Sequence, residues 1–184
     1  MMGERMTILL FGVSNVGKTT AGGILAQRLG YDFYDLDDEV KKYYNTTLED
    51  FVNTGILLDR DRKRGCVIDM IMKKREDKVF VISPISYSQY FNRYLAREDV
   101  LAIELQDSPE HIFERLVFSD ENDREYKDDE YKNAHKQYYI SEIKKDILGY
   151  RRSFAKVENK FYMDNDTAGL AVERIIKEYH LDKG

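Results

Sequence analysis

The sequence predicts an α/β fold built on a mostly parallel sheet, and two observations support this prediction. Short apolar runs, rich in β-branched and aromatic residues, alternate with longer stretches of helical periodicity, which is the pattern of βαβ units. A glycine-rich loop of the phosphate-binding type directly follows the first run and opens a helical stretch. The runs expected to form strands are Thr7–Phe11, Asp32–Tyr34, Val79–Ile82, Val100–Leu105 and Phe161–Met163.

Length and composition favour a single domain covering residues 1–184. Hydrophobic residues make up 42% of the 184 residues and charged residues 34%, which is enough apolar material for a core. The sequence contains no run of about 18 apolar residues that could span a membrane. The apolar N-terminal stretch has the pattern of a strand, not of a signal peptide. The single Cys66 cannot form an internal disulfide, which favours a cytoplasmic location. The net charge of −5 argues against nucleic-acid and membrane partners.

Three helices can be placed by their apolar faces and end signals. The first follows the glycine-rich loop and is expected to end at Gly30. The second is expected to begin with Ser108 as its cap and Pro109 in the first turn, and the last to begin after a capping region at Asp164–Asp166. Their apolar faces are Ala21, Ile24, Leu25 and Leu29 in the first, Ile112, Phe113, Leu116 and Val117 in the second, and Ala168, Val172, Ile175, Ile176 and Tyr179 in the last.

The most specific motif is the run from Gly12 to Thr19, which reads GVSNVGKT and matches the phosphate-binding loop G-x-x-x-x-G-K-T. Glycines let the backbone curl so that successive N–H groups point at phosphate oxygens, and the following helix directs the positive end of its dipole at them. Lys18 supplies a mobile positive charge to the β- and γ-phosphates, and Thr19 offers a hydroxyl to Mg²⁺. The residues expected to bind the nucleotide are Gly12, Ser14, Asn15, Val16, Gly17, Lys18, Thr19 and Thr20.

A group of carboxylates follows the second expected strand, in the run Phe33–Asp38. Ligands of open α/β sheets gather beyond the carboxyl ends of the strands. If the chain stays extended, Asp35 and Asp37 lie on the same side, where they could hold Mg²⁺ through water and accept the proton of an attacking hydroxyl. The alternative is that these acids only cap a helix that begins near Asp38.

Two further charged segments are open to more than one interpretation. Residues 55–64 contain a dense basic run, which could bind an anionic group or form a solvated helix face paired with neighbouring acids. Ser119–Tyr138 contains no aliphatic residue except Ala134, so it cannot bury a core face. We expect a solvated helix, a mobile loop or both in that segment, and an exposed helical hairpin without a role is the alternative to a functional segment.

The order of these features resembles the shikimate kinase family of small phosphate-binding-loop kinases. The resemblance covers the loop after the first strand, F-Y-D-x-D after the second, a Gly-x-x-x-x-Arg segment that opens a helix, and D-S-P-E-x-I-x-E-R-L after the fourth strand. It implies a three-layer α/β/α fold with a five-stranded parallel sheet of order 2-3-1-4-5, a polar lid over residues 119–139, and the use of ATP with Mg²⁺.

The same resemblance assigns roles to individual residues. Lys18 and Thr19 would serve the phosphates and the metal, Asp35 would lie in the outer shell of the metal, and Asp37 would orient or deprotonate the substrate hydroxyl. Arg60 would meet a substrate carboxylate, and Arg124 is the expected lid arginine, which would complete the charge clamp on the phosphoryl group. The expected catalytic residues are thus Lys18, Asp37 and Arg124.

Two departures from the family concern the acceptor. The glycine-rich turn after the third strand is replaced by Ser83–Tyr87, whose side chains would fill space that the family leaves open. The second carboxylate-binding arginine of the family aligns with Tyr150, so that the adjacent Arg151 becomes the candidate.

We therefore expect an ATP-dependent kinase, monomeric, that phosphorylates a hydroxyl of a small metabolite, shikimate or a related hydroxy acid. Two alternatives remain. One is a nucleotide-binding sensor or interaction protein that keeps the ATP site without catalysis, and the other is a nucleoside or nucleotide kinase.

Overall fold

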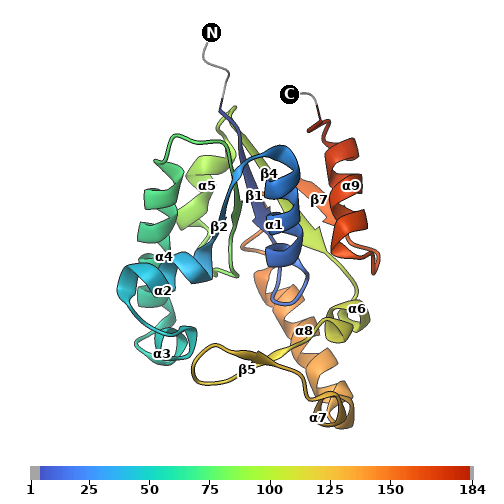
Figure 1. The fold of residues 1–184 in the computed structure, drawn as a ribbon. Coiled ribbons are helices and arrows are strands. Elements are labelled where there is room, and N and C mark those ends of the chain that lie inside the picture. Colours follow the sequence, from blue (N-terminus) through green and yellow to red (C-terminus); the bar gives the residue numbers. More distant parts are fainter. Residues whose placement is uncertain (1–4, 183–184) are drawn as a thin grey trace.

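A parallel sheet forms the centre of the molecule, which is a computed structural model describing residues 5–182 (Figure 1). Its strands follow the order β2-β3-β1-β4-β7, and every neighbouring pair is parallel. The expected order 2-3-1-4-5 is confirmed, because the last strand in the chain takes the fifth place. The strands are β1 (Thr7–Phe11), β2 (Asp32–Asp35), β3 (Lys78–Val81), β4 (Val100–Gln106) and β7 (Asn159–Tyr162).

Helices cover both faces of this sheet, as a three-layer arrangement requires (Figure 1). Because side chains alternate along a strand, Ile8 and Leu10 of β1 join one buried core, while Leu9 and Phe11 join the other. The helices are α1 (Lys18–Leu29), α2 (Leu36–Tyr44), α3 (Leu48–Asn53), α4 (Leu57–Met72), α5 (Gln89–Leu95), α6 (Pro109–Glu114), α7 (Asp129–Ala134), α8 (Lys136–Tyr150) and α9 (Ala168–Glu178). None of the helices within residues 5–182 has the length and apolar character of a membrane span.

The sequence signals correctly predict where α1 ends and where α6 begins, but they predict the wrong N-terminal cap for α9. Gly30 ends α1 in the left-handed region, and the Ser108 hydroxyl caps α6 by accepting the N–H of His111 at 3.1 Å. The cap of α9 is Thr167, whose hydroxyl accepts from Leu170, and not the acidic stretch Asp164–Asp166. In that stretch Asp164 and Asn165 adopt positive φ angles, so it forms the turn that precedes the helix.

Two other expectations about local structure need correction. Helix α6 ends at Glu114, so Leu116 and Val117 lie beyond it and not on its inward face. The polar segment 119–138 contains the exposed helix α7, as expected, but it begins with a short antiparallel hairpin that the sequence did not suggest. Its strands are β5 (Phe118–Ser119) and β6 (Glu125–Tyr126).

Candidate active site

The loop Gly12–Thr19 connects β1 to α1 at the carboxyl end of the sheet. A Cβ on Gly12 would lie 2.6 Å from the carbonyl oxygen of Leu105, and the residue has φ 143°, so glycine is required there. Gly17 has φ 108° and immediately precedes the first residue of α1. The curl of the loop therefore depends on glycine, as the motif predicts.

Lys18 is buried at the start of α1. Its ammonium donates to the carbonyl oxygens of Gly12 at 2.9 Å and Val13 at 2.8 Å, so it folds back on the loop. Burial lowers the pKa of Lys18 to about 8, against the opposing attraction of Asp37 and Asp35. The side chain thus holds a charge that carboxylates stabilise only in part, and an anion in the loop would stabilise it further.

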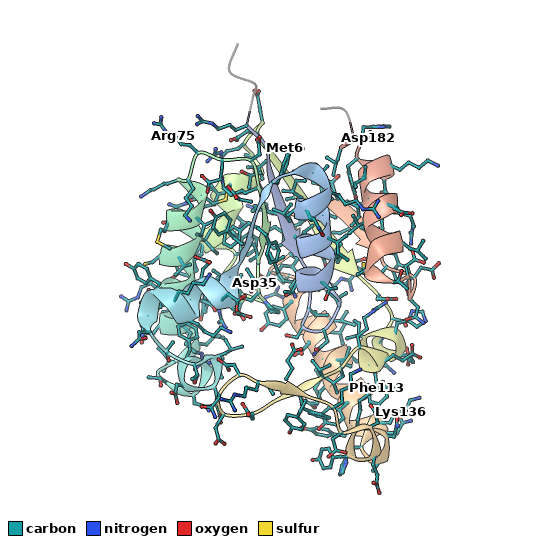
Figure 2. All side chains as sticks on the ribbon, in the orientation of Figure 1. Met6, Asp35, Arg75, Phe113, Lys136 and Asp182 are labelled. Atoms are coloured by element: carbon teal, nitrogen blue, oxygen red, sulfur yellow. The ribbon has the colours of Figure 1, made fainter. Side chains whose placement is uncertain are left out.

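Asp35 connects α1, β2 and α2. The Thr19 hydroxyl donates to its Oδ2 at 2.7 Å, and the backbone N–H of Asp37 donates to its Oδ1 at 3.0 Å. Burial raises the pKa of Asp35, the Thr19 hydrogen bond opposes this, and the charges of Asp37 and Asp38 add to the rise. Figure 2 shows Asp35 where β2 meets α2, at the opposite end of the sheet from Met6.

The expected extended conformation of the acidic run is wrong, because the chain turns into helix at Leu36. Asp35 is the cap of α2, so the capping interpretation holds for this residue, although the helix begins before Asp38. Asp37 lies in the first turn, where its Oδ1 is buried without a hydrogen-bond partner among the described residues. The turn of the helix, and not strand alternation, thus brings both carboxylates beside the loop.

Two cavities meet at Lys18 and Thr19. The first, of about 440 Å³, is called the Arg115 cavity here, and the second, of about 390 Å³, the Asp37 cavity. The Arg115 cavity is lined by Asn15, Gly17, Lys18, Thr19, Thr20, Arg115, Val117, Glu125, Met163, Asp166, Thr167 and Ala168. The Asp37 cavity is lined by Ser14, Asn15, Lys18, Thr19, Asp35, Asp37, Leu48, Val81, Ser83, Pro84, Val117, Phe118, Ser119 and Glu125.

Most of the expected nucleotide-binding residues line these cavities. Gly12 and Val16 do not, because Gly12 packs against Leu105 and Val16 is completely buried in the core. Ser14 and Thr20 each line one cavity, and Asn15 lines both. The loop as a whole therefore separates into residues that face the cavities and residues that shape the turn.

The expected arginines do not gather beside Asp37. The Arg60 guanidinium donates to the carbonyl oxygen of Gly55 at 2.9 Å, and Arg124 is exposed on the hairpin. Arg151 is exposed and lines a third cavity of about 440 Å³, with Leu148 of α8 and Tyr162 of β7. None of the three lines the Asp37 cavity.

Arg115 was not singled out in the sequence, although it belongs to the quoted string D-S-P-E-x-I-x-E-R-L. Its guanidinium lies 2.7 Å from Oδ2 of the buried Asp107. Burial would raise the pKa of Asp107, but hydrogen bonds from His111 and Arg115 outweigh it and lower the pKa. The pair holds the positively charged guanidinium of Arg115 in the Arg115 cavity.

Asp61 is the second residue that the sequence did not reveal. It is fully buried, and its Oδ2 accepts the backbone N–H groups of Ser86 at 2.8 Å and Tyr87 at 3.1 Å. Its Oδ1 lies 3.3 Å from the Arg64 guanidinium. Asp61 therefore anchors the turn that brings Ser83 and Pro84 to the wall of the Asp37 cavity, as the replaced glycine turn predicts.

The donor set suits Mg²⁺ only if a ligand supplies most of the oxygens. Within residues 5–182 no group of three His, Cys, Asp or Glu side chains could hold a metal ion by itself. Mg²⁺ is usually bound by one or two protein oxygens together with phosphates and water, and Thr19 with Asp35 offers such a pair. The buried, unpartnered Oδ1 of Asp37 beside them also fits a site that a ligand completes.

Comparison with known proteins relates this chain to shikimate kinases. The family model described as shikimate kinase matches residues 14–176. The shikimate kinase of Bacillus subtilis is 31% identical over 109 residues, covering 59% of this chain and 58% of that protein. The alignments with the first curated relatives thus cover less than two thirds of the length of those relatives.

Solved structures agree in fold. A shikimate kinase from Bacteroides thetaiotaomicron superposes with a TM-score of 0.75 at 17% identity, covering 95% of this chain and 98% of that one. The shikimate kinase of Acinetobacter baumannii in complex with shikimate gives a TM-score of 0.71 at 15% identity, with coverages of 98% and 96%. Because the family model matches most of its length, the chain belongs to the shikimate kinase family.

Proposed function

We propose that this protein is an ATP-dependent kinase that transfers the γ-phosphoryl group to a hydroxyl of a small metabolite, shikimate or a related hydroxy acid. One observation carries the proposal: Lys18 and Thr19 line both the Arg115 cavity and the Asp37 cavity. A nucleotide in the first and an acceptor in the second would therefore meet at the end of the phosphate-binding loop. Membership of the shikimate kinase family supports the acceptor class.

On the nucleotide side, Lys18 would exchange its two carbonyl acceptors for the phosphate oxygens of ATP. The exchange is favourable because the buried ammonium then faces full negative charges in place of carbonyl dipoles. Mg²⁺ bound near Thr19 and Asp35 would neutralise charge on the β- and γ-phosphates. Arg115, held by Asp107, would add a fixed positive charge in the same cavity.

On the acceptor side, Asp37 would orient the hydroxyl and take its proton. Its Oδ1 is buried and has no hydrogen-bond partner among residues 5–182, and the residue lines the cavity that the acceptor would enter. Catalysis would consist mainly of positioning and charge neutralisation, because phosphoryl transfer requires little covalent chemistry from the protein.

The three other arginines keep their expected roles in this proposal, and each would have to move. The Arg124 side chain would turn inward from the hairpin, and Arg60 would leave the carbonyl of Gly55 to meet a substrate carboxylate. Arg151 would approach from its own cavity. We further propose that the chain acts as a cytoplasmic, monomeric single domain without nucleic-acid or membrane partners.

Specific observations favour each of the two alternatives. The absence of Arg60, Arg124 and Arg151 from the lining of the Asp37 cavity favours a nucleotide-binding protein without catalysis. Phe118 lines the same cavity and offers an aromatic face, which favours a nucleoside or nucleotide acceptor that could stack on it.

The decisive experiment measures ADP release from Mg·ATP with shikimate, other small hydroxy acids and nucleosides, for the wild type and two variants. Asp37→Asn should lower kcat roughly 10²–10⁴-fold with little change in the KM for ATP. Glu49→Gln is the control, because Glu49 is exposed on α3 and should leave turnover unchanged. Nucleoside-dependent release would favour the second alternative, and ATP binding without any acceptor-dependent release would favour the first.

A further inference from the structure

The β5–β6 hairpin extends from the end of α6 across to α3 (Figure 1), and residues of its strands line the two cavities. At its tip, Oδ2 of Asp123 accepts a hydrogen bond from the backbone N–H of Leu48 at 2.8 Å, between residues 75 apart in the chain. The same oxygen lies 4.0 Å from the ammonium of Lys41. One carboxylate thus contacts both the first residue of α3 and a side chain of α2.

The hairpin tip is a defined turn that aims Asp123 at these partners. Asp120 accepts the backbone N–H groups of Asn122 at 2.8 Å and Arg124 at 3.0 Å on its Oδ1, and its own N–H donates to the carbonyl oxygen of Arg124 at 3.0 Å. Asp123 has φ 60°, and its side chain is 17% exposed, whereas Glu121 and Asn122 are exposed. The Asp123 carboxylate is therefore withdrawn from solvent although it lies on a polar surface hairpin.

Both ends of this contact belong to elements that form the Asp37 cavity. Phe118, Ser119 and Glu125 of the hairpin strands line that cavity, and so does Leu48, the first residue of α3. Lys41 follows Asp37 by one helical turn on α2, so the two side chains share a face of that helix. The Asp123 contact consequently joins two elements that both contribute lining residues to the cavity that would hold the acceptor.

Charge explains why an aspartate can occupy this position beside several other acids. Lys41 forms an ion pair with Asp38 at 2.9 Å in addition to its approach to Asp123. Burial would lower the pKa of Lys41, but the hydrogen bond to Asp38 and the charges of Asp38, Asp123 and Asp37 outweigh burial and raise it. Lys41 therefore stays charged and offsets the repulsion that these carboxylates would otherwise exert on one another.

We propose that Asp123 is a positioning residue that holds the hairpin over the Asp37 cavity during phosphoryl transfer. This inference rests on the proposed function and adds to it the means by which closure of the lid is coupled to α2 and α3. Opening the contact admits the acceptor, and remaking it places the hairpin between the acceptor and bulk water. A closed site favours transfer to the bound hydroxyl over transfer to water.

The test compares Asp123→Ala, Asp123→Asn and the control Glu121→Gln, a charge removal at an exposed position of the same hairpin. Asp123→Ala should raise the KM for the acceptor about tenfold, the equivalent of one charged hydrogen bond, with the KM for ATP within about twofold of wild type. It should also raise the fraction of ATP that is hydrolysed without phosphoryl transfer. Asp123→Asn should give an intermediate result, because its amide oxygen can still accept from Leu48 but carries no charge for Lys41.

Hydrogen exchange at the Leu48 amide supplies a readout that does not depend on turnover. Exchange should accelerate at least about tenfold in Asp123→Ala and stay at the wild-type rate in Glu121→Gln. If Asp123→Ala transfers the phosphoryl group normally, with an unchanged KM for the acceptor and an unchanged hydrolysed fraction of ATP, the proposed role of Asp123 is wrong while the proposed function stands. Absence of acceptor-dependent ADP release from the wild type contradicts the proposed function itself, so the two failures are distinguishable.

Discussion

The Thr19 hydroxyl donates a 2.7 Å hydrogen bond to Oδ2 of Asp35, and this bond joins the first turn of α1 to the end of β2. The other oxygen of the same carboxylate accepts the N–H of Asp37 and caps α2. A structural role and the proposed metal role therefore coincide in one side chain. A substitution that keeps the helix cap but removes the charge therefore tests the proposed metal role by itself.

Asp35→Asn should separate the two roles, because the asparagine oxygen can still accept the N–H of Asp37 and its amide nitrogen can donate to the Thr19 hydroxyl, but the side chain carries no charge for Mg²⁺. We expect the Mg²⁺ concentration for half-maximal activity to rise at least about tenfold, with little loss of thermal stability. Magnesium titrations and thermal unfolding check this, with Asp32→Asn at the exposed start of β2 as the control. An unchanged magnesium requirement would exclude Asp35 from the metal site.

Lys18 should make nucleotide binding dependent on pH. Its pKa is lowered to about 8 by burial in the free protein, whereas bound phosphates favour the charged ammonium. The complex therefore holds this proton more tightly than the free protein does, and affinity for ATP should be flat below about pH 8 and fall by up to about tenfold per pH unit above it. Calorimetric titrations from about pH 6.5 to about pH 9.5 span this range and measure the dependence.

The matching variant is Lys18→Ala, which should bind ATP more weakly at about pH 7 and should not show the decline above about pH 8. It should also abolish most turnover, because phosphate clamping is lost. The same decline in both proteins would assign the titration to another group, and turnover close to that of the wild type would contradict the role of Lys18.

Helix α4 contains two ion pairs, each between residues three positions apart, one buried and one exposed. Asp61 and Arg64 are buried, with side-chain exposures of 0% and 10%, whereas Asp59 and Arg62 are exposed at 50% and 65%. Asp61→Ala should lower the free energy of unfolding by about 3 kcal/mol, because the buried Arg64 and the N–H groups of the following turn lose their partner. Asp59→Ala should cost less than about 1 kcal/mol.

Urea denaturation of both variants measures the difference. Equal losses would show that Asp61 does not anchor the Ser83–Tyr87 turn. A further consequence can be tested on the same protein, since release of this turn should alter the KM for the acceptor more than the KM for ATP.

Gly12 of the phosphate-binding loop and Gly23 of the following helix α1 should respond in opposite ways to substitution by alanine. Gly12→Ala places a Cβ 2.6 Å from backbone oxygen at φ 143°, so we expect loss of nucleotide binding together with lower stability. Gly23 lies inside α1, where an added Cβ would have no neighbouring atom of residues 5–182 within 4 Å outside its own helix turn. Gly23→Ala should therefore raise the free energy of unfolding by about 0.5–1 kcal/mol. Thermal unfolding and ATP titration of both variants check this, and a stable, ATP-binding Gly12→Ala would contradict the close-approach argument.

The sheet and the phosphate-binding loop could be predicted because they depend on local patterns. Apolar runs such as Thr7–Phe11 are buried along their whole length, and the glycines of the loop are needed for backbone geometry that short-range sequence encodes. The sequence does not predict the hairpin, because β5 and β6 have only two residues each and Asp120 holds the turn between them. Such strands carry no periodicity.

The candidate site was only partly predictable for a different reason. Asp35 and Asp37 were identified, but their relation depends on where the helix begins, which the capping hydrogen bond sets. The Arg60 side chain folds back on the carbonyl oxygen of Gly55, and Arg151 follows the last residue of α8, and no spacing in the sequence predicts either placement. Asp61 was hidden among the charges of residues 55–64, because burial alone distinguishes it from Asp59.

Apart from the residues that line both cavities, the two cavities draw on different stretches of the chain. Asp35, Asp37, Leu48, Val81, Ser83 and Pro84 line only the Asp37 cavity, whereas Arg115, Met163, Asp166, Thr167 and Ala168 line only the Arg115 cavity. Under the proposed function, substitutions between Leu36 and Tyr87 can change acceptor choice while the nucleotide half stays intact. Acceptor specificity could thus change in evolution through substitutions in one continuous stretch of the gene. Grafting that segment from a related kinase should transfer acceptor specificity in the same way.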